Sequence, residues 1–395
     1  MSTLDELIAA ARRQAVAGPL ADASAEGARV MGICNSCRYC EGYCAVFPAM
    51  ERRVEFSPAD IDFLANLCHN CGACYYACQY APPHDFAINV PRALAQVRLQ
   101  SYERFAWPRR LAGLYRRQGT AIAIALAFTL MLFFALAIAL AGPRGLLAAH
   151  TGAGSFYAVL PHGLMVAIFG ASFLFSLAAL AIGAVRYWRA VNVPGPNAAP
   201  ASGAATAQAA RDALTLRYLD GGGDGCPVRS GLDFAPTPLR RSLHHLLFYG
   251  FLLCFAATSV ATLYHYLFGW VAPYELPSLP KLLGVPGGVS LMIGTAGLWH
   301  LNRQRHPLHG DAAQKPMDLG FIALLFLTSA SGLALWLGRG TPALALLLCI
   351  HLGAVMALFA TLPYGKFAHG IFRTAALLRH AIEKRQPNPI GLSDE

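Results

Sequence analysis

Six long apolar stretches constrain this chain more than any other feature of its sequence. They contain no Asp, Glu, Lys or Arg, and each has about the 20 residues that a helix needs to cross the hydrocarbon core of a bilayer. They occupy residues 120–141, 156–185, 243–271, 282–301, 319–337 and 341–363. Only 13% of the 395 residues are charged and the mean hydropathy is +0.44, which is too apolar for a soluble protein. The sequence therefore predicts six membrane-spanning helices.

The distribution of positive charge predicts the orientation of these helices. Lys and Arg are frequent before the first stretch, between the second and third, after the fourth and after the sixth, and they are rare in the remaining loops. By the positive-inside rule, both termini lie in the cytoplasm. Since no secretory signal is evident, we expect a multi-pass protein of the bacterial inner membrane whose N-terminal part is cytoplasmic. This topology accounts for the net charge of +10, so no nucleic-acid partner is expected.

Eight of the eleven cysteines fall into two copies of one pattern. Each copy has the spacing Cys-x-x-Cys-x-x-Cys-x-x-x-Cys, which in bacterial ferredoxins holds two [4Fe-4S] clusters. Three closely spaced thiolates wrap one cubane, and the fourth reaches across to the other cluster. We therefore expect the first cluster to be bound by Cys34, Cys37, Cys40 and Cys78. The second is expected to be bound by Cys68, Cys71, Cys74 and Cys44.

Structural zinc and disulfide bonds are the alternatives for these cysteines. Zinc sites usually take their ligands in pairs, and a cytoplasmic domain is too reducing for a disulfide framework. One departure from the ferredoxin pattern is that Ala45 and Gln79 replace the proline that usually follows the fourth cysteine. We expect this difference to alter loop packing more than ligation.

Together these features predict a mainly α-helical protein, with a bacterial-ferredoxin-like 2[4Fe-4S] domain followed by a six-helix transmembrane bundle. The expected divisions are an amphipathic N-terminal segment (1–31), the iron-sulfur domain (32–90), a basic juxtamembrane segment (91–119), two spans (120–185), a cytoplasmic loop rich in Gly, Ala and Pro (186–242), the four remaining spans (243–370) and a cytoplasmic tail (371–395).

Histidines in or beside the apolar stretches are the candidate ligands of haem b. An imidazole at membrane depth is costly unless it binds a metal or finds a hydrogen-bond partner. The candidates are His244, His245, His300 and His369 near the cytoplasmic face, and His162, His265 and His351 near the opposite face. The alternative is that some histidines reach toward the lipid headgroups, which is plausible for His244, and also for His162 and His300.

Helix periodicity arranges these candidates in pairs. If the last span continues as one helix, His351 and His369 lie on one face about 27 Å apart. We therefore expect one or two haems between the third and sixth spans, with His244 or His245 opposite His369, and His265 opposite His351. Helical phase favours His244, whereas the spacing to Gly250, which resembles that of nitrate reductase gamma subunits, favours His245, so this choice stays open.

The residues around both cysteine motifs resemble a known family. The stretches 29–44 (RVMGICNSCRYCEGYC) and 68–84 (CHNCGACYYACQYAPPH), and the order of parts along the whole chain, are similar to the tricarballylate/citrate utilisation protein B family. The resemblance implies an electron-transfer subunit of an oxidoreductase rather than a self-contained enzyme. It would reoxidise the FAD of a separate tricarballylate dehydrogenase, which converts tricarballylate to cis-aconitate, and pass the electrons through the clusters and haem to membrane quinone.

The segment from His351 to His369 also resembles the last haem-binding helix of nitrate reductase gamma subunits and related membrane cytochromes b. There, two ligand histidines stand on the final helix, which supports these two positions. Two other functions stay open: electron transfer from a different flavoprotein dehydrogenase or a heterodisulfide-reductase-like partner, and redox sensing by a labile cluster without haem. Transport of polyanions is disfavoured, because the spans contain no acidic or basic side chain besides histidine.

Overall fold

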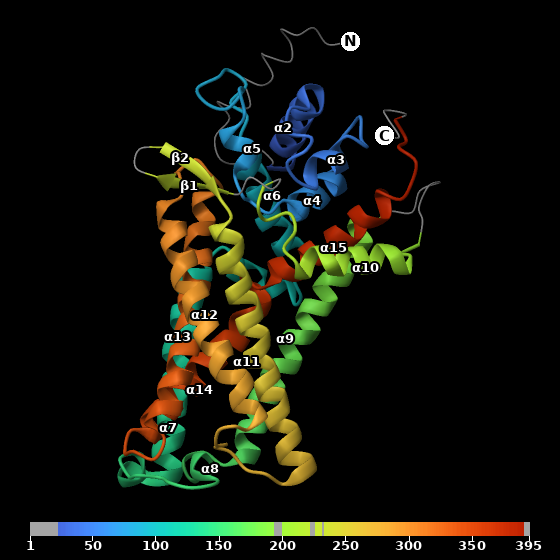
Figure 1. Cartoon of the computed structure of the whole chain (residues 1–395). Coiled ribbons are helices and arrows are strands. Elements are labelled where there is room, and N and C mark those ends of the chain that lie inside the picture. The colour runs from blue at the N-terminus through green and yellow to red at the C-terminus, as the bar shows by residue number, and fades with distance from the viewer. Residues whose placement is uncertain (1–22, 193–199, 222–225, 231–232, 391–395) are drawn as a thin grey trace.

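The computed structural model describes residues 23–192, 200–221, 226–230 and 233–390. Figure 1 shows the cysteine-containing N-terminal helices gathered at one end of a bundle of long helices. Most of the expected N-terminal segment 1–31 lies outside the described residues, as do the last five residues of the expected tail.

Five helices build the N-terminal part. They are α2 (Ala23–Cys37), α3 (Val46–Met50), α4 (Pro58–Leu67), α5 (Ala73–Tyr76) and α6 (Val90–Phe105). The start of α4 is fixed by a capping box, in which Ser57 accepts a hydrogen bond from the backbone of Asp60 and the Asp60 side chain accepts one in return. Because α4 ends at Leu67, it places Cys68 and the second motif directly after a rigid element.

The prediction of six spans is confirmed for the described part of the chain, where six helices are long and apolar enough to cross a membrane. They are α7 (Gln118–Leu146), α9 (His162–Val191), α11 (Leu239–Phe268), α12 (Leu279–Gln304), α13 (Lys315–Gly338, preceded by the 3-10 helix η2, Ala312–Gln314) and α14 (Leu344–Thr361, continued by the 3-10 helix η3, Leu362–Tyr364). The predicted mainly α-helical architecture, with an iron-sulfur-type domain before a six-helix bundle, is therefore correct.

Shorter elements connect the spans. The 3-10 helix η1 (Arg109–Tyr115) precedes α7, α8 (Ser155–Val159) lies between α7 and α9, and α15 (Ala368–Glu383) follows η3. The loop expected at 186–242 contains regular structure: the helix α10 (Gly203–Leu214) and a hairpin in which β1 (Cys226–Ser230) pairs antiparallel with β2 (Asp233–Thr237). Ser202 caps α10 through its hydroxyl, which accepts from Ala205 N at 3.1 Å.

Glycines bring α11 and α12 into backbone contact. A Cβ atom at Gly250 would lie 2.7 Å from the amide nitrogen of Leu291, and one at Gly287 would lie 3.0 Å from the amide nitrogen of Cys254. Small residues allow such close approach of membrane helices, where packing rather than the hydrophobic effect drives association. The rotation of α11 about its axis is fixed by this contact, and with it the direction of the side chains near its cytoplasmic end.

An aromatic cluster joins the N-terminal part to the membrane bundle. Between ring centres, Tyr102 of α6 lies 5.5 Å from Tyr115 of η1 and 5.3 Å from Phe372 of α15. Tyr187, at the cytoplasmic end of α9 by the predicted topology, lies 5.2 Å from Phe372. Tyr102, Tyr187 and Phe372 are buried, so the two parts share one core, and α15 lies between them (Figure 1).

Candidate metal centres

The end of α2 and the loop after it carry the first cysteine motif. Cys34, Cys37 and Cys40 line a small cavity of about 30 Å³, and Cys78, the last cysteine of the second motif, lines it too. Burial and then the nearby thiol of Cys78 raise the pKa of Cys34 to about 12. The structure thus gathers the four cysteines that the sequence assigns to one cluster, including the one that must cross over.

The second motif has the reciprocal arrangement. Burial and then the thiol of Cys68 raise the pKa of Cys44 to about 12. Burial and then the thiol of Cys44 raise the pKa of Cys74 well above its usual range. Cys44 is therefore close to Cys68 and Cys74, as the crossover predicts, and Cys40 of its own motif acts on it more weakly. The ligand roles themselves stay predictions.

The donor set fits iron-sulfur cubanes better than a single ion. Within the described ranges, no group of three or more His, Cys, Asp or Glu side chains is close enough together to hold one metal ion. A cubane spreads its four thiolates around a body of four irons and four sulfides, whereas zinc draws its ligands onto one atom. Thiolates whose pKa values are raised by burial and by one another need that positive charge to remain ionised.

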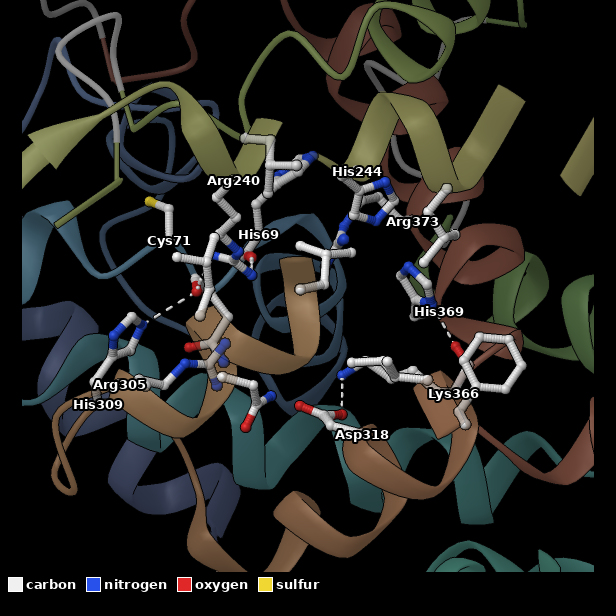
Figure 2. A pocket seen from close by; sticks show the side chains of 18 of the residues that line it. His69, Cys71, Arg240, His244, Arg305, His309, Asp318, Lys366, His369 and Arg373 are labelled. Carbon is white, nitrogen blue, oxygen red and sulfur yellow. Dashed lines mark hydrogen bonds and ion pairs between the residues drawn. The ribbon is translucent and has the colours of Figure 1, made fainter. Parts of the chain in front are cut away.

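A second cavity, of about 140 Å³, lies between the second cysteine motif and the membrane helices. Figure 2 shows Cys71 and His69 on the side of the motif, with His244 of α11 and His369 of α15 facing the same space. The residues that line this cavity therefore include one predicted cluster ligand and two predicted haem ligands.

The rings of His244 and His369 have the separation that a shared metal requires. Their centres are 6.3 Å apart and their planes are nearly perpendicular, at 76°. Two metal–imidazole bonds of about 2 Å each place the ring centres of a bis-histidine site about 6 Å apart. These side chains, from helices more than a hundred residues apart in sequence, would hold the iron of one haem between them.

The surroundings of Nδ1 in both histidines are compatible with a metal bound between the two rings. His369 Nδ1 faces the backbone carbonyl of Lys366, which is how metal-bound imidazoles are usually oriented, and leaves Nε2 for the metal. Burial and then Arg373 lower the pKa of His369 well below its usual value, so the imidazole is neutral and able to bind a metal. His244 Nδ1 is buried and lacks a hydrogen-bond partner in the described part of the chain.

His245 points elsewhere. Its Nε2 lies 3.1 Å from the backbone carbonyl of Thr215, just after α10. The helical phase of α11 thus directs His244, and not its neighbour, toward α15. Of the two histidines expected opposite His369, the structure therefore places His244 there and not His245.

The expected far-side pair is arranged differently. His265 stacks on His162 of α9, with ring centres 3.7 Å apart and planes at 23°, and His265 Nδ1 is buried without a described partner. His351 instead has its Nδ1 3.2 Å from Ser331 Oγ of α13. His162 was both a candidate ligand and a plausible interfacial residue, and its contact with His265 was not predicted. Roles of His265 and His351 as haem ligands stay predictions. In the part of the chain that the structure describes, the rings of His244 and His369 have the separation that a shared iron would require.

The continuous helix expected from His351 to His369 is not present. α14 ends at Thr361, η3 carries Pro363, and α15 begins at Ala368. Proline lacks the amide hydrogen that a continuing helix needs, and Gly365 has extended backbone angles. The assumption that His351 and His369 share one helical face was therefore wrong, because a break redirects α15 under the N-terminal part.

Sequence reasoning also missed the cations around the cavity. The lining includes four arginines and the lysine of a buried ion pair: Arg98, Arg240, Arg305, Arg373 and Lys366. Lys366 Nζ lies 2.6 Å from Asp318 Oδ1. The sequence signal was the spacing of Arg240 four residues before His244 and of Arg373 four residues after His369, which places each pair on one helical face.

Comparisons with known proteins identify the family of this chain. The family profile "Citrate utilization protein B" matches residues 114–390, and "Citrate utilization protein B Fer4-like domain" matches residues 27–104. The chain belongs to the citrate utilization protein B family. A curated member, citrate utilization protein B of Escherichia coli, is 54% identical over 377 residues, which cover 95% of this chain and 97% of that protein. No solved structure matches the chain.

Membership in the citrate utilization protein B family confirms the resemblance found in the sequence. The Fer4-like match covers both cysteine motifs, and the six apolar helices mark a multi-pass membrane protein.

Proposed function

We propose that this chain is a membrane electron-transfer subunit that reoxidises a flavoprotein through two [4Fe-4S] clusters and at least one haem b, and delivers the electrons to quinone. The Fer4-like domain and the family name indicate an iron-sulfur role in citrate utilization. The finer assignment, to the reduced FAD of a dehydrogenase like that for tricarballylate, extends the family resemblance.

One observation carries this proposal. A single cavity is lined by Cys71 on one side and by His244 and His369 on another. A cluster ligand and a fitting haem site therefore adjoin one space, which gives an iron-sulfur centre a direct neighbour inside the membrane domain. A redox sensor needs no such neighbour.

The residues of this chain supply binding, orientation and charge. Cysteine thiolates hold the clusters, His244 and His369 hold the haem, and the cationic lining of the cavity suits the carboxylates of a haem. When bound, these groups carry one electron at a time. Reoxidation of one flavin hydroquinone releases two electrons and two protons, and reduction of one quinone consumes two of each, so the overall exchange balances.

By the positive-inside topology, the donor side is cytoplasmic. The N-terminal part lies at the end of the bundle where the loops rich in arginine are found, including the segments that begin α11 and precede α7. A cytoplasmic flavoprotein can reach the clusters there, and a lipid-dissolved quinone can reach the bundle from the bilayer.

The decisive experiment is cofactor analysis of the purified protein in detergent. Optical spectra before and after dithionite, pyridine haemochrome quantitation, and iron and sulfide analysis are measured on the same sample. We expect about eight non-haem irons per chain and at least one haem b. Iron and sulfide for two clusters without any haem would contradict the membrane half of the proposal and favour a sensor or tethered ferredoxin.

The donor is tested separately. Anaerobic mixing with reduced tricarballylate dehydrogenase should reduce the haem, whereas an unrelated FAD-dependent dehydrogenase should not. Reduction by the unrelated enzyme at an equal rate would assign a broader or different donor while leaving the cofactor chain intact.

A further inference from the structure

The loop of the second cysteine motif is held through its backbone by arginines from distant helices. Arg373 of α15 donates to the carbonyl of Cys68 at 2.7 Å, and Arg98 of α6 donates to the same oxygen at 2.7 Å. Arg240 of α11 donates to the carbonyl of Asn70 at 2.7 Å. Charge-assisted hydrogen bonds such as these are about twice as strong as neutral ones. The loop is therefore fixed to the membrane domain as well as to the N-terminal part that contains it.

Two of these arginines share a helix with the histidine pair. Arg240 precedes His244 by four residues on α11, and Arg373 follows His369 by four residues on α15. Residues four apart lie on one face, one turn from each other. Figure 2 shows Arg240 near His69, and Arg373 near His244 and His369. Each helix thus presents an imidazole to the cavity and a guanidinium to the loop.

The charge of these arginines acts on a cluster in the same loop. A cubane with four thiolate ligands is an anion, and one more electron increases its negative charge. Hydrogen bonding and nearby charge are among the factors that set the potential of such a centre. Guanidinium groups bound to the Cys68 and Asn70 carbonyls favour the reduced form, and therefore raise the potential of the second cluster.

We propose that Arg240 and Arg373 are positioning residues that couple the second iron-sulfur cluster to the His244–His369 site, by fixing the cluster loop one helical turn from each histidine and by raising the potential of that cluster. The inference rests on the proposed function, because it takes this cavity to be the haem site. It assigns an electron order in which the second cluster, and not the first, delivers to the haem.

The step that these arginines serve is a single electron transfer. With a cluster held by the second motif and a haem held by His244 and His369, the cluster would give up one electron and the haem iron would accept it. No bond forms or breaks in this step and no proton is required. The electron is supplied by the reduced flavin of the donor through the first cluster.

The test uses the full-length protein with Arg240→Gln, Arg373→Gln and Arg373→Lys. Arg186→Gln is the matched control, since Arg186 also binds a backbone carbonyl, that of Ala106 at 2.8 Å, but does not line the cavity. Cluster potentials are measured by redox titration with electron paramagnetic resonance. Haem reduction is followed after rapid mixing with dithionite, and Cys71→Ser provides the rate of direct haem reduction without the second cluster.

We expect both Gln variants to keep their haem and clusters, to shift the potential of the second cluster to more negative values, and to leave that of the first unchanged. Haem reduction should slow by about tenfold toward the Cys71→Ser rate, as for other residues that orient a metal ligand. In Arg373→Lys, the potential of the second cluster should stay close to the wild-type value, because the lysine keeps the positive charge. Haem reduction should still be slow in this variant, because an ammonium group lacks the planar fork of a guanidinium. Arg186→Gln should change neither quantity.

Two results would overturn the inference. One is that both Gln variants retain the wild-type cluster potential and haem reduction rate. The other is that Arg373→Gln and Arg373→Lys both lose the cluster, because the arginine would then be structural. A wild-type protein with two clusters and no haem would refute the proposed function instead, and a negative shift of the second cluster in Arg373→Gln would still support the effect of the arginine on that cluster.

Discussion

Arg38 and Gly72 occupy the same place in the two cysteine motifs, directly after the second cysteine, and both have left-handed backbone angles, with φ of 55° and 87°. Their surroundings differ. The side chain of Arg38 donates to the carbonyl of Asn35 in its own loop at 3.0 Å. At Gly72, a Cβ atom would lie 2.8 Å from Nδ1 of His309, so no side chain fits without moving that ring.

The same contrast extends over both motifs. Tyr39 in the first motif is 66% exposed, whereas Cys68 and Cys71 in the second are buried. The same spacing predicts the same ligation in both motifs, whereas the surroundings of the two motifs differ. An open motif can meet a donor, and an enclosed motif can meet only the rest of its own chain.

The largest effect should come from removing a crossover ligand. Cys44 belongs to the first motif, but its thiol lies near that of Cys68. The substitution Cys44→Ser should therefore remove the second cluster. We expect iron to fall from about eight to about four atoms per chain, with the paramagnetic signal of the first cluster retained. Cys78→Ser is the converse control and should remove the first cluster. Loss of the first cluster in Cys44→Ser would show that each motif binds its own cubane.

Haem content should separate His244 from its neighbour. His244→Ala and His369→Ala should each lose the haem held in the cavity beside the second motif, since an axial ligand is removed. His245→Ala should keep it, because that imidazole faces Thr215. Pyridine haemochrome quantitation measures the difference. Equal haem loss from His245→Ala and His244→Ala would contradict the orientation of α11.

Exchanging residues at the equivalent positions should affect the two motifs unequally. Gly72→Ala should destabilise the fold by about 1–3 kcal/mol, because it adds left-handed strain and displaces the His309 ring. Arg38→Gly should change stability by less than about 1 kcal/mol, since relief of strain offsets the greater freedom of the unfolded chain. Thermal unfolding in detergent, with iron retention as the second readout, measures both. Equal destabilisation would remove the distinction between an enclosed and an open loop.

The smallest effect concerns the contact beside the enclosed motif. Asn89 caps α6 through its side-chain oxygen and donates from Nδ2 to the carbonyl of Leu308 at 2.7 Å. Asn89→Asp keeps the cap and loses the donor, so we expect a cost of about 1 kcal/mol, whereas Asn89→Ala should cost about 1 kcal/mol more. Unfolding midpoints of the two variants test this. An unchanged unfolding midpoint in Asn89→Asp would show that the hydrogen bond to Leu308 does not contribute to stability.

Local sequence patterns predicted much of this molecule. The six spans follow from the length of the apolar stretches, and the grouping of Cys78 with the first motif follows from ferredoxin spacing. Depth and helical phase predicted that His244 or His245 faces His369 and left the choice between the two open. The helix assumed between His351 and His369 is broken at Pro363.

What the sequence did not predict depends on contacts between distant segments. Arg240 and Arg373 were assigned to membrane topology alone, because nothing local indicates that they meet the backbone of a cysteine loop about 170 and 305 residues away. The ring of His309 over Gly72 was missed for the same reason. The helix α10 was missed because its alanine-rich sequence lies among the Gly and Pro residues typical of linkers.

The glycines between α11 and α12 have a consequence for how sequences of this kind can vary. A methyl group at Gly250 would meet the backbone at Leu291 and turn α11, which would move His244 from its place opposite His369. A position that touches no cofactor thus limits which cofactor the protein can hold. Among relatives of this chain, we expect substitutions to accumulate on the lipid-facing side of α11 while Gly250 and Gly287 change as rarely as the histidines themselves.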